Sequence, residues 1–135
     1  MDWGRARVGV AVSDETGRLA RPVETVREDS RAGAVGAVAR VAVREGAGEI
    51  VVGLPLNMDG TEGDSARSAR AFAELLKTSA GLPVILWDER LSSREGQRLG
   101  REGGRPGRKP LDTDQAAACV LLQNYLDARR GGAAA

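Results

Sequence analysis

Two apolar segments between residues 50 and 91 each lead directly into a polar turn whose residue types suit phosphate or metal chemistry. The first, Ile50–Pro55, runs into the loop Leu56–Gly63, which contains Asn, Asp, Thr and two glycines. The second, Pro83–Trp87, is followed at once by the cluster Asp88-Glu89-Arg90. The intervening residues have helical periodicity, so the pattern predicts a β-α-β unit with parallel strands. Because ligands bind at the carboxyl ends of such strands, the loop and the acid cluster should face the same crevice.

The chain contains no histidine and a single cysteine, Cys119, and this composition excludes several kinds of site. Ser-His-Asp and Cys-His catalytic groups, histidine-ligated zinc and thiolate metal clusters are all ruled out. An enzyme with this composition must rely on carboxylates, arginines and an oxygen-ligated hard cation such as Mg²⁺ or Mn²⁺. Cys119 lies in an apolar helical pattern and is predicted to be a small core residue rather than a reactive thiol.

The length of 135 residues is typical of one domain with a substantial core. No apolar run approaches the ~20 residues of a membrane span, and the N-terminus shows no signal-peptide pattern. We therefore expect a cytoplasmic protein without a membrane partner. The net charge of only +1 excludes a globally basic nucleic-acid binder, so nucleic-acid binding must come from a local patch.

The elements that must position these residues can be placed by periodicity and turn signals. Strands are expected at residues 7–13, 19–26, 50–54 and 84–87, and helices at residues 30–46, 65–76, 94–102 and 112–130. This order indicates an α/β fold in which a mixed sheet is flanked by helices. Residues 1–130 are predicted to form one domain and residues 131–135 a disordered tail.

Capping signals and apolar spacing set the expected ends and faces of the helices. Ser30 is predicted to cap the first helix, and Asp64 or Ser65 the second. The residues expected to be buried on the first and last helices are Val35, Val38, Ala39, Ala42 and Val43, and Ala116, Ala117, Val120, Leu121 and Tyr125.

Four motifs, in order along nearly the whole chain, resemble those of the YqgF/RuvX family. They are Asp2–Ala11 (D-x-G-x-x-R-x-G-V-A), Gly53–Thr61 (G-L-P-L-N-M-D-G-T), Asp88–Ser92 (D-E-R-L-S) and Asp114–Ala117. The nine-residue loop motif alone is highly specific. The resemblance implies an RNase H-like fold, with a mixed five-stranded sheet flanked by helices on both faces. It also implies nuclease activity and a role in maturing the 5′ end of precursor 16S rRNA, and the family has been described as a Holliday-junction resolvase as well.

The resemblance further implies that Asp2, Glu89 and Asp114 meet at one sheet edge as catalytic residues and metal ligands. Carboxylates from separate elements can hold two Mg²⁺ or Mn²⁺ ions about 4 Å apart, which activate water and neutralise charge on the phosphate. Each acid also has a plainer explanation. Asp114 would only complement a helix dipole, Glu89 would only pair with Arg90 or Arg94, and Asp2 would be a terminal residue without a role. Their joint occurrence in family order favours the catalytic explanation.

The loop after the first motif strand and several arginines are candidates for nucleic-acid binding. The loop carries backbone amides that can face a phosphate just before a helix N-terminus. A flexible basic arm after the acid cluster suits sequence-independent phosphate contacts. The predicted nucleic-acid contacts are Asn57, Asp59, Gly60, Thr61, Arg67, Arg90 and Arg94. A purely structural loop and a solvated arginine face are the alternatives, and for Arg67 taken alone the solvated face is favoured.

The chain departs from the family pattern at its N-terminus. In the family the first strand begins several apolar residues before the aspartate, whereas only Met1 precedes Asp2 here. We expect the true start to lie upstream, and the alternative is a chain that lacks its first strand.

Three functions stay open at this point. The preferred one is a metal-dependent nuclease that acts on precursor 16S rRNA, free or on the pre-30S particle, as a monomer or weak homodimer. The second is a Holliday-junction-resolving DNA endonuclease, which would act on branched DNA and should need a dimer. The third is a non-catalytic RNA-binding module of ribosome assembly.

Overall fold

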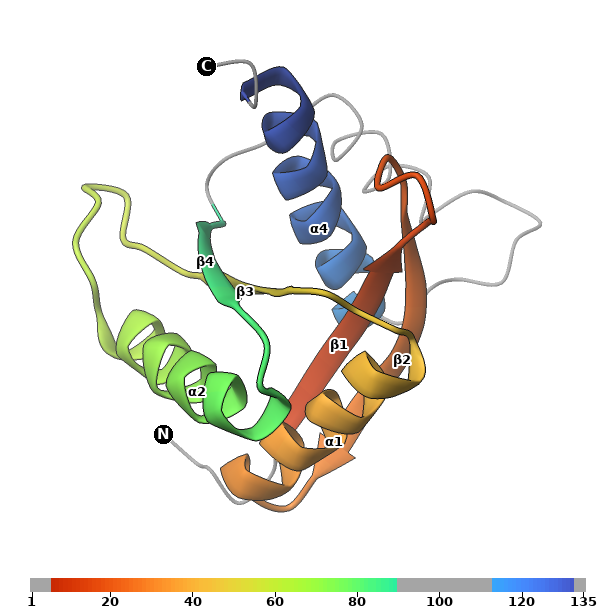
Figure 1. Cartoon of the computed structure of the whole chain (residues 1–135). Coiled ribbons are helices and arrows are strands. Elements are labelled where there is room, and N and C mark those ends of the chain that lie inside the picture. Colours follow the sequence, from red (N-terminus) through yellow and green to blue (C-terminus); the bar gives the residue numbers. More distant parts are fainter. Residues whose placement is uncertain (1–5, 90–112, 133–135) are drawn as a thin grey trace. The chain divides into compact units, whose positions relative to one another are not determined.

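The computed structural model describes residues 6–89 and 113–132, and these residues divide into two compact units (Figure 1). The elements are β1 (Ala6–Ser13), β2 (Ala20–Glu28), α1 (Arg31–Arg44), β3 (Ile50–Leu54), α2 (Asp64–Ala80), β4 (Val84–Asp88) and α4 (Thr113–Gly132). The strands of this part of the chain form two two-stranded sheets, β1 with β2 and β3 with β4. The chain is thus a small α/β protein, as its sequence predicts. The helix expected at residues 94–102 lies outside the described residues.

The first unit contains the predicted β-α-β arrangement. Strands β3 and β4 are parallel and pair in register from Ile50 opposite Val84 to Leu54 opposite Asp88. Helix α2 connects them and packs against both, and α1 packs against α2 (Figure 1). The register confirms that the two strands end side by side.

Helix α1 begins as predicted, because the Ser30 Oγ accepts a hydrogen bond from the Gly33 N–H at 3.0 Å. Its buried residues are Ala34, Val35, Val38, Val41 and Ala42. The prediction that Val43 faces the core is wrong, since its side chain is 75% exposed. Val41 takes that place because it lies three residues after Val38, on the same helix face.

Helix α2 begins earlier than either predicted cap would allow. Its N-cap is Gly63, which has no side chain to donate or accept, and Asp64 is the first helical residue. The prediction of a capping Asp64 or Ser65 is therefore wrong, although an acid in the first turn still complements the helix dipole. The helix ends at Ala80, and its C-cap Gly81 has a φ of +66°, the left-handed conformation that glycine adopts most easily.

The second unit pairs the β1–β2 hairpin with α4. Only six residues separate β1 from β2, too few for a parallel crossover, so the strands are antiparallel. The Asp14 carboxylate organises the turn by accepting hydrogen bonds from the Arg18 N–H at 3.0 Å and the Thr16 hydroxyl at 2.8 Å. These hydrogen bonds lower the pKa of Asp14.

The face that α4 buries is more polar than its sequence predicts. Gln123 is fully buried, donates to the Arg18 carbonyl at 2.7 Å and accepts from the Ala20 N–H at 2.9 Å. Its amide thereby satisfies backbone groups of the hairpin that an apolar side chain would leave unpaired. The prediction that Ala117 is buried is wrong, because this residue is exposed.

Cys119 is buried, and burial raises the pKa of its thiol to about 11, which confirms the predicted core residue. Helix α4 also continues to Gly132, two residues into the predicted disordered tail. Glycine lowers helix propensity without forbidding a final turn.

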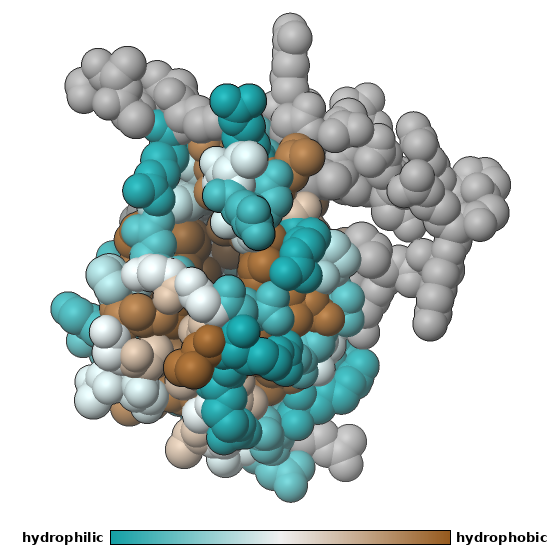
Figure 2. All heavy atoms as spheres, turned by 45° about the vertical axis from the view of Figure 1, so that its right-hand side comes forward, coloured by the Kyte–Doolittle hydropathy of each residue, from teal (hydrophilic) through white to brown (hydrophobic). Residues whose placement is uncertain are grey.

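Apolar side chains reach the surface of the described residues in several separate places. Figure 2 shows hydrophobic residues interspersed with hydrophilic ones on the face that it presents. The large exposed apolar side chains come from different segments: Leu19, Val43, Met58 and Leu75. None of the helices in this part of the chain combines the length and the apolar character that a membrane span requires.

Candidate active site

The carboxyl ends of β3 and β4 form the core of the candidate site. Pairing continues one step past the strands, since the Glu89 N–H donates to the Leu54 carbonyl at 3.2 Å. The loop that starts at Pro55 and the acid Glu89 therefore leave the sheet at the same edge. This confirms the shared edge predicted from the two apolar segments.

The Glu89 side chain lies against the backbone of β3 at Gly53. A Cβ built on Gly53 would overlap the Glu89 Oε1 and would lie 3.0 Å from its Cδ and Cγ. Glu89 is exposed as a whole, but its carboxyl group is partly buried. This burial raises the pKa of the carboxyl group, and the negative charge of Asp88 raises it further. A cation beside the carboxylate would offset both effects.

The raised pKa of Glu89 predicts a pH-dependent effect of Glu89→Gln on stability. Between the unfolded value near 4.5 and the raised folded value, the native state binds more protons than the unfolded state. Stability contributed by this group is therefore lost as pH rises through that window. The quantity to follow is the melting temperature of Glu89→Gln minus that of the wild type, measured in EDTA. This difference should increase as pH rises between the two pKa values and stay constant at higher pH. Thermal unfolding at a series of pH values checks this, and a constant difference would contradict the burial of the carboxyl group.

The loop between β3 and α2 is a small ordered hairpin. Leu56 forms an antiparallel bridge with Glu62, and the Asn57 N–H donates to the Thr61 carbonyl at 2.9 Å. The Gly60 N–H donates to the Asn57 carbonyl at 2.9 Å, and its φ of +87° explains the glycine at this position.

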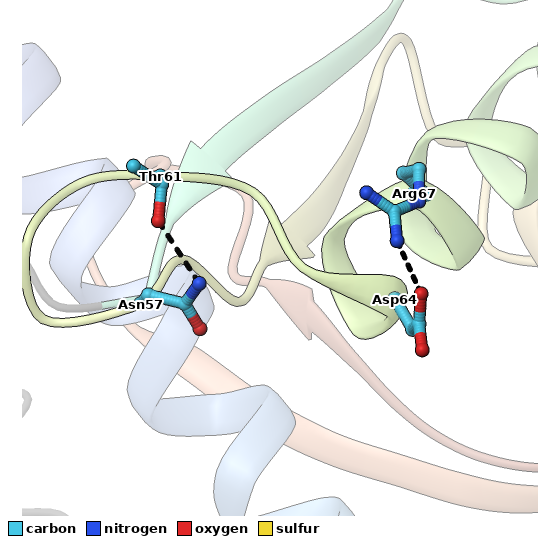
Figure 3. A network of polar contacts seen from close by, with 4 residues as sticks. All are labelled: Asn57, Thr61, Asp64 and Arg67. Carbon is cyan, nitrogen blue, oxygen red and sulfur yellow. Dashed lines mark hydrogen bonds and ion pairs between the residues drawn. The ribbon is translucent and has the colours of Figure 1, made fainter.

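The polar side chains of this loop bind one another. The Asn57 amide donates to the Thr61 Oγ1 at 3.0 Å (Figure 3), and the Thr61 hydroxyl donates to the Asp59 carboxylate at 2.6 Å. Asp59 also accepts from the Thr61 N–H at 3.0 Å. The structure therefore brings together the predicted loop residues Asn57, Asp59, Gly60 and Thr61. Their mutual contacts fix the shape of the loop, with Met58 98% exposed.

Two arginines on α2 form exposed ion pairs beside this loop. Arg67 pairs with Asp64 (Figure 3), and Arg70 makes two contacts with Glu62, at 2.6 and 2.8 Å. The Arg70 pair lowers the pKa of Glu62 and raises that of Arg70. Exposed pairs of this kind contribute little to stability, so phosphate can replace the carboxylate partners at small cost.

Asp114 lies in the first turn of α4, in the unit that contains the hairpin. The backbone of this turn touches β1 at Gly9, where a Cβ would overlap the Asp114 carbonyl group and lie 2.8 Å from the Gln115 nitrogen. The Gln115 amide also donates to the Thr25 hydroxyl at 3.3 Å. The start of α4 is thus fixed against the hairpin by both backbone and side-chain contacts.

The remaining predicted site residues, Asp2, Arg90 and Arg94, lie outside the described residues. Within residues 6–89 and 113–132, no three acidic or cysteine side chains gather as a metal-binding group. Glu89 belongs to the first unit and Asp114 to the second.

Sequence reasoning missed the two glycines that contact the acid-bearing segments. Gly9 and Gly53 each interrupt a run of strand-forming residues. A glycine inside a strand weakens it and often marks a close approach by another group. That signal could have identified both positions.

Comparison with known proteins gives a consistent result. A family model described as "RuvX: Holliday junction resolvase" matches residues 1–128. A relative from Anaeromyxobacter sp. (strain Fw109-5) is 48% identical over 130 residues, covering 96% of this chain and 95% of the relative. Relatives from Myxococcus xanthus (strain DK1622) and Chloroflexus aurantiacus (strain ATCC 29366 / DSM 635 / J-10-fl) are 44% and 38% identical, covering 96% of this chain and 87% and 86% of their own lengths. All three bear the name "Putative pre-16S rRNA nuclease".

Proposed function

The chain belongs to the RuvX family of nucleases, and from this premise we propose that it cleaves precursor 16S rRNA with the help of Mg²⁺ or Mn²⁺. The family match confirms the resemblance carried by the four motifs. The observation that carries the proposed mechanism is the Glu89 carboxyl group, held against β3 at the edge where the loop begins. The named substrate of the relatives supports the choice of RNA.

The chemistry of the donor set fits a hard cation. Glu89 offers carboxylate oxygens, and a bound cation would offset the partial burial and the charge of Asp88 that raise its pKa. Asp2, Glu89 and Asp114 would hold the metal. When bound, the metal supplies an activated water and neutralises charge on the scissile phosphate.

The protein itself would bind and orient the RNA. The N-terminus of α2, next to the loop at residues 57–63, has no side-chain cap and can approach a phosphate. The N–H groups of Asn57, Gly60 and Thr61 donate within the loop and hold its shape. Arg67 can exchange its exposed partner Asp64 for a phosphate. Arg90 and Arg94 would supply further phosphate contacts. The ordered hydrogen bonds of the loop support this role, because they fix its backbone before RNA binds.

The proposal includes the finer features expected of the family. The strands would belong to one RNase H-like mixed sheet of five strands with helices on both faces. The setting would be the cytoplasm, with the pre-30S particle as the larger partner and the protein as a monomer or weak homodimer.

Metal removal and a choice of substrates test this proposal. The protein is offered a 5′-extended 16S rRNA fragment and a four-way DNA junction, each with Mg²⁺, with Mn²⁺ or with EDTA. We expect cleavage of the RNA, its loss in EDTA, and its return when excess Mg²⁺ is added. Preferred cleavage of the junction, with dimers on gel filtration, would instead support the resolvase. Tight RNA binding without cleavage under any condition would support an assembly module.

A further inference from the structure

Gly53 is a glycine that the backbone does not require. The glycines with positive φ among the described residues are Gly17, Gly46, Gly60 and Gly81. Gly53 is not one of them, and it lies inside β3, directly opposite Trp87 of β4. A glycine in a strand interior costs stability relative to residues with a side chain. Space, rather than conformation, must therefore explain it.

The nearest atoms to a Cβ built on Gly53 belong to one side chain, that of Glu89. Three atoms of Glu89 (Oε1, Cδ and Cγ) lie within 3.0 Å of the position that a Cβ would occupy. A small rotation of the carboxyl group cannot relieve this overlap, because Cγ moves only when the whole side chain swings. The root of the side chain is fixed in turn by the hydrogen bond from the Glu89 N–H to the Leu54 carbonyl.

We propose that Gly53 is a positioning residue, whose missing side chain allows the Glu89 carboxylate to lie against β3 at the end of the sheet. This inference rests on the proposed function, in which Glu89 is a metal ligand. An alanine in place of Gly53 would leave the β3–β4 pairing intact but turn the carboxylate away. Gly53 acts on the reaction only through Glu89.

Gly53→Ala tests the inference, and Gly48→Ala is the matched control. Gly48 is exposed, lies just before β3, and a Cβ there would meet nothing within 4 Å. Mutation of residues that support metal ligands typically lowers metal affinity or activity by about 10–100-fold. We expect Gly53→Ala to weaken Mn²⁺ binding, measured by electron paramagnetic resonance, and kcat for RNA cleavage by about tenfold or more, with KM for RNA unchanged. Gly48→Ala should leave all three unchanged.

A double-mutant cycle with Glu89→Ala separates positioning from a general effect on the strand. In the wild-type background Gly53→Ala should lower the melting temperature, because the added methyl group and the Glu89 side chain compete for space. In the Glu89→Ala background these three atoms are gone, so the same change should raise the melting temperature and leave Mn²⁺ affinity unaltered. An equal loss of stability in both backgrounds, or unchanged Mn²⁺ affinity and kcat in Gly53→Ala, would overturn the inference.

The cycle also distinguishes failure of the inference from failure of the proposed function. A wild-type protein that neither binds Mn²⁺ nor cleaves RNA would refute the function and, with it, a catalytic role for Gly53. In that case the steric contact between Gly53 and Glu89 would still be measurable, because Gly53→Ala would lower the melting temperature of the wild type and raise that of Glu89→Ala.

Discussion

Replacing Glu89 with Gln or Asp114 with Asn should each reduce RNA cleavage about a thousandfold while leaving the fold and RNA binding nearly intact. An amide keeps the shape of the acid but carries no charge to balance a metal ion. Metal ions contribute several kcal/mol to stabilising a phosphoryl transition state. Each factor of ten in rate corresponds to about 1.36 kcal/mol of activation free energy, so a loss of about 4 kcal/mol of transition-state stabilisation slows cleavage about a thousandfold. Single-turnover cleavage with Mg²⁺, circular dichroism and filter binding of RNA measure the three quantities.

Two exposed acids provide matched controls for these substitutions. Glu74 lies on α2 and Asp29 follows β2, and neither belongs to the proposed ligand set. Glu74→Gln and Asp29→Asn should cleave at the wild-type rate. Wild-type cleavage by Glu89→Gln or by Asp114→Asn would refute the metal-carboxylate mechanism.

Gly9→Ala should cause the largest loss of stability among the single substitutions considered for this chain. The added Cβ would overlap the Asp114 carbonyl group and crowd the Gln115 nitrogen, and both are backbone atoms at the start of α4. Overpacking typically costs about 1–3 kcal/mol, and here no flexible side chain can yield. A loss of about 3 kcal/mol corresponds to a fall in melting temperature of about 10 °C for a domain of this size. Urea and thermal unfolding measure both quantities.

The same substitution should also affect cleavage, because the turn that carries Asp114 must shift away from β1. We expect reduced kcat at temperatures where Gly9→Ala remains folded. Gly48→Ala again serves as the control, with a melting temperature close to that of the wild type. A similar melting temperature for Gly9→Ala would contradict the close contact between β1 and α4.

The elements around the shared sheet edge could be predicted because local signals and tertiary packing agree there. The continuous apolar runs of β3 and β4 fit strands joined through a helix, and the observed register places Leu54 beside Asp88. The turn residues of the loop are typical of a reversal of the chain, and Gly60 has a positive φ there.

The errors arise where packing depends on groups distant in the sequence. Gln123 is buried because it bonds Arg18 and Ala20 of the hairpin, more than 100 residues away, and hydrophobic patterning cannot anticipate this. The contacts of Gly9 and Gly53 likewise depend on distances between elements. On α1, Val41 is buried and Val43 is exposed, although the two lie only two residues apart. Periodicity alone does not decide which of two such neighbouring valines faces the core.

Mapping the 5′ end of a 5′-extended 16S rRNA fragment after incubation with Mg²⁺ or Mn²⁺ decides whether the protein is a metal-dependent nuclease. Wild-type protein and Glu89→Gln are compared at equal concentration, after circular dichroism has shown that both are folded. The metal-dependent nuclease mechanism predicts that the wild type trims the fragment to the mature 5′ end and that Glu89→Gln leaves it extended. Equal trimming by both proteins, or no trimming by folded wild type with either metal, would contradict it.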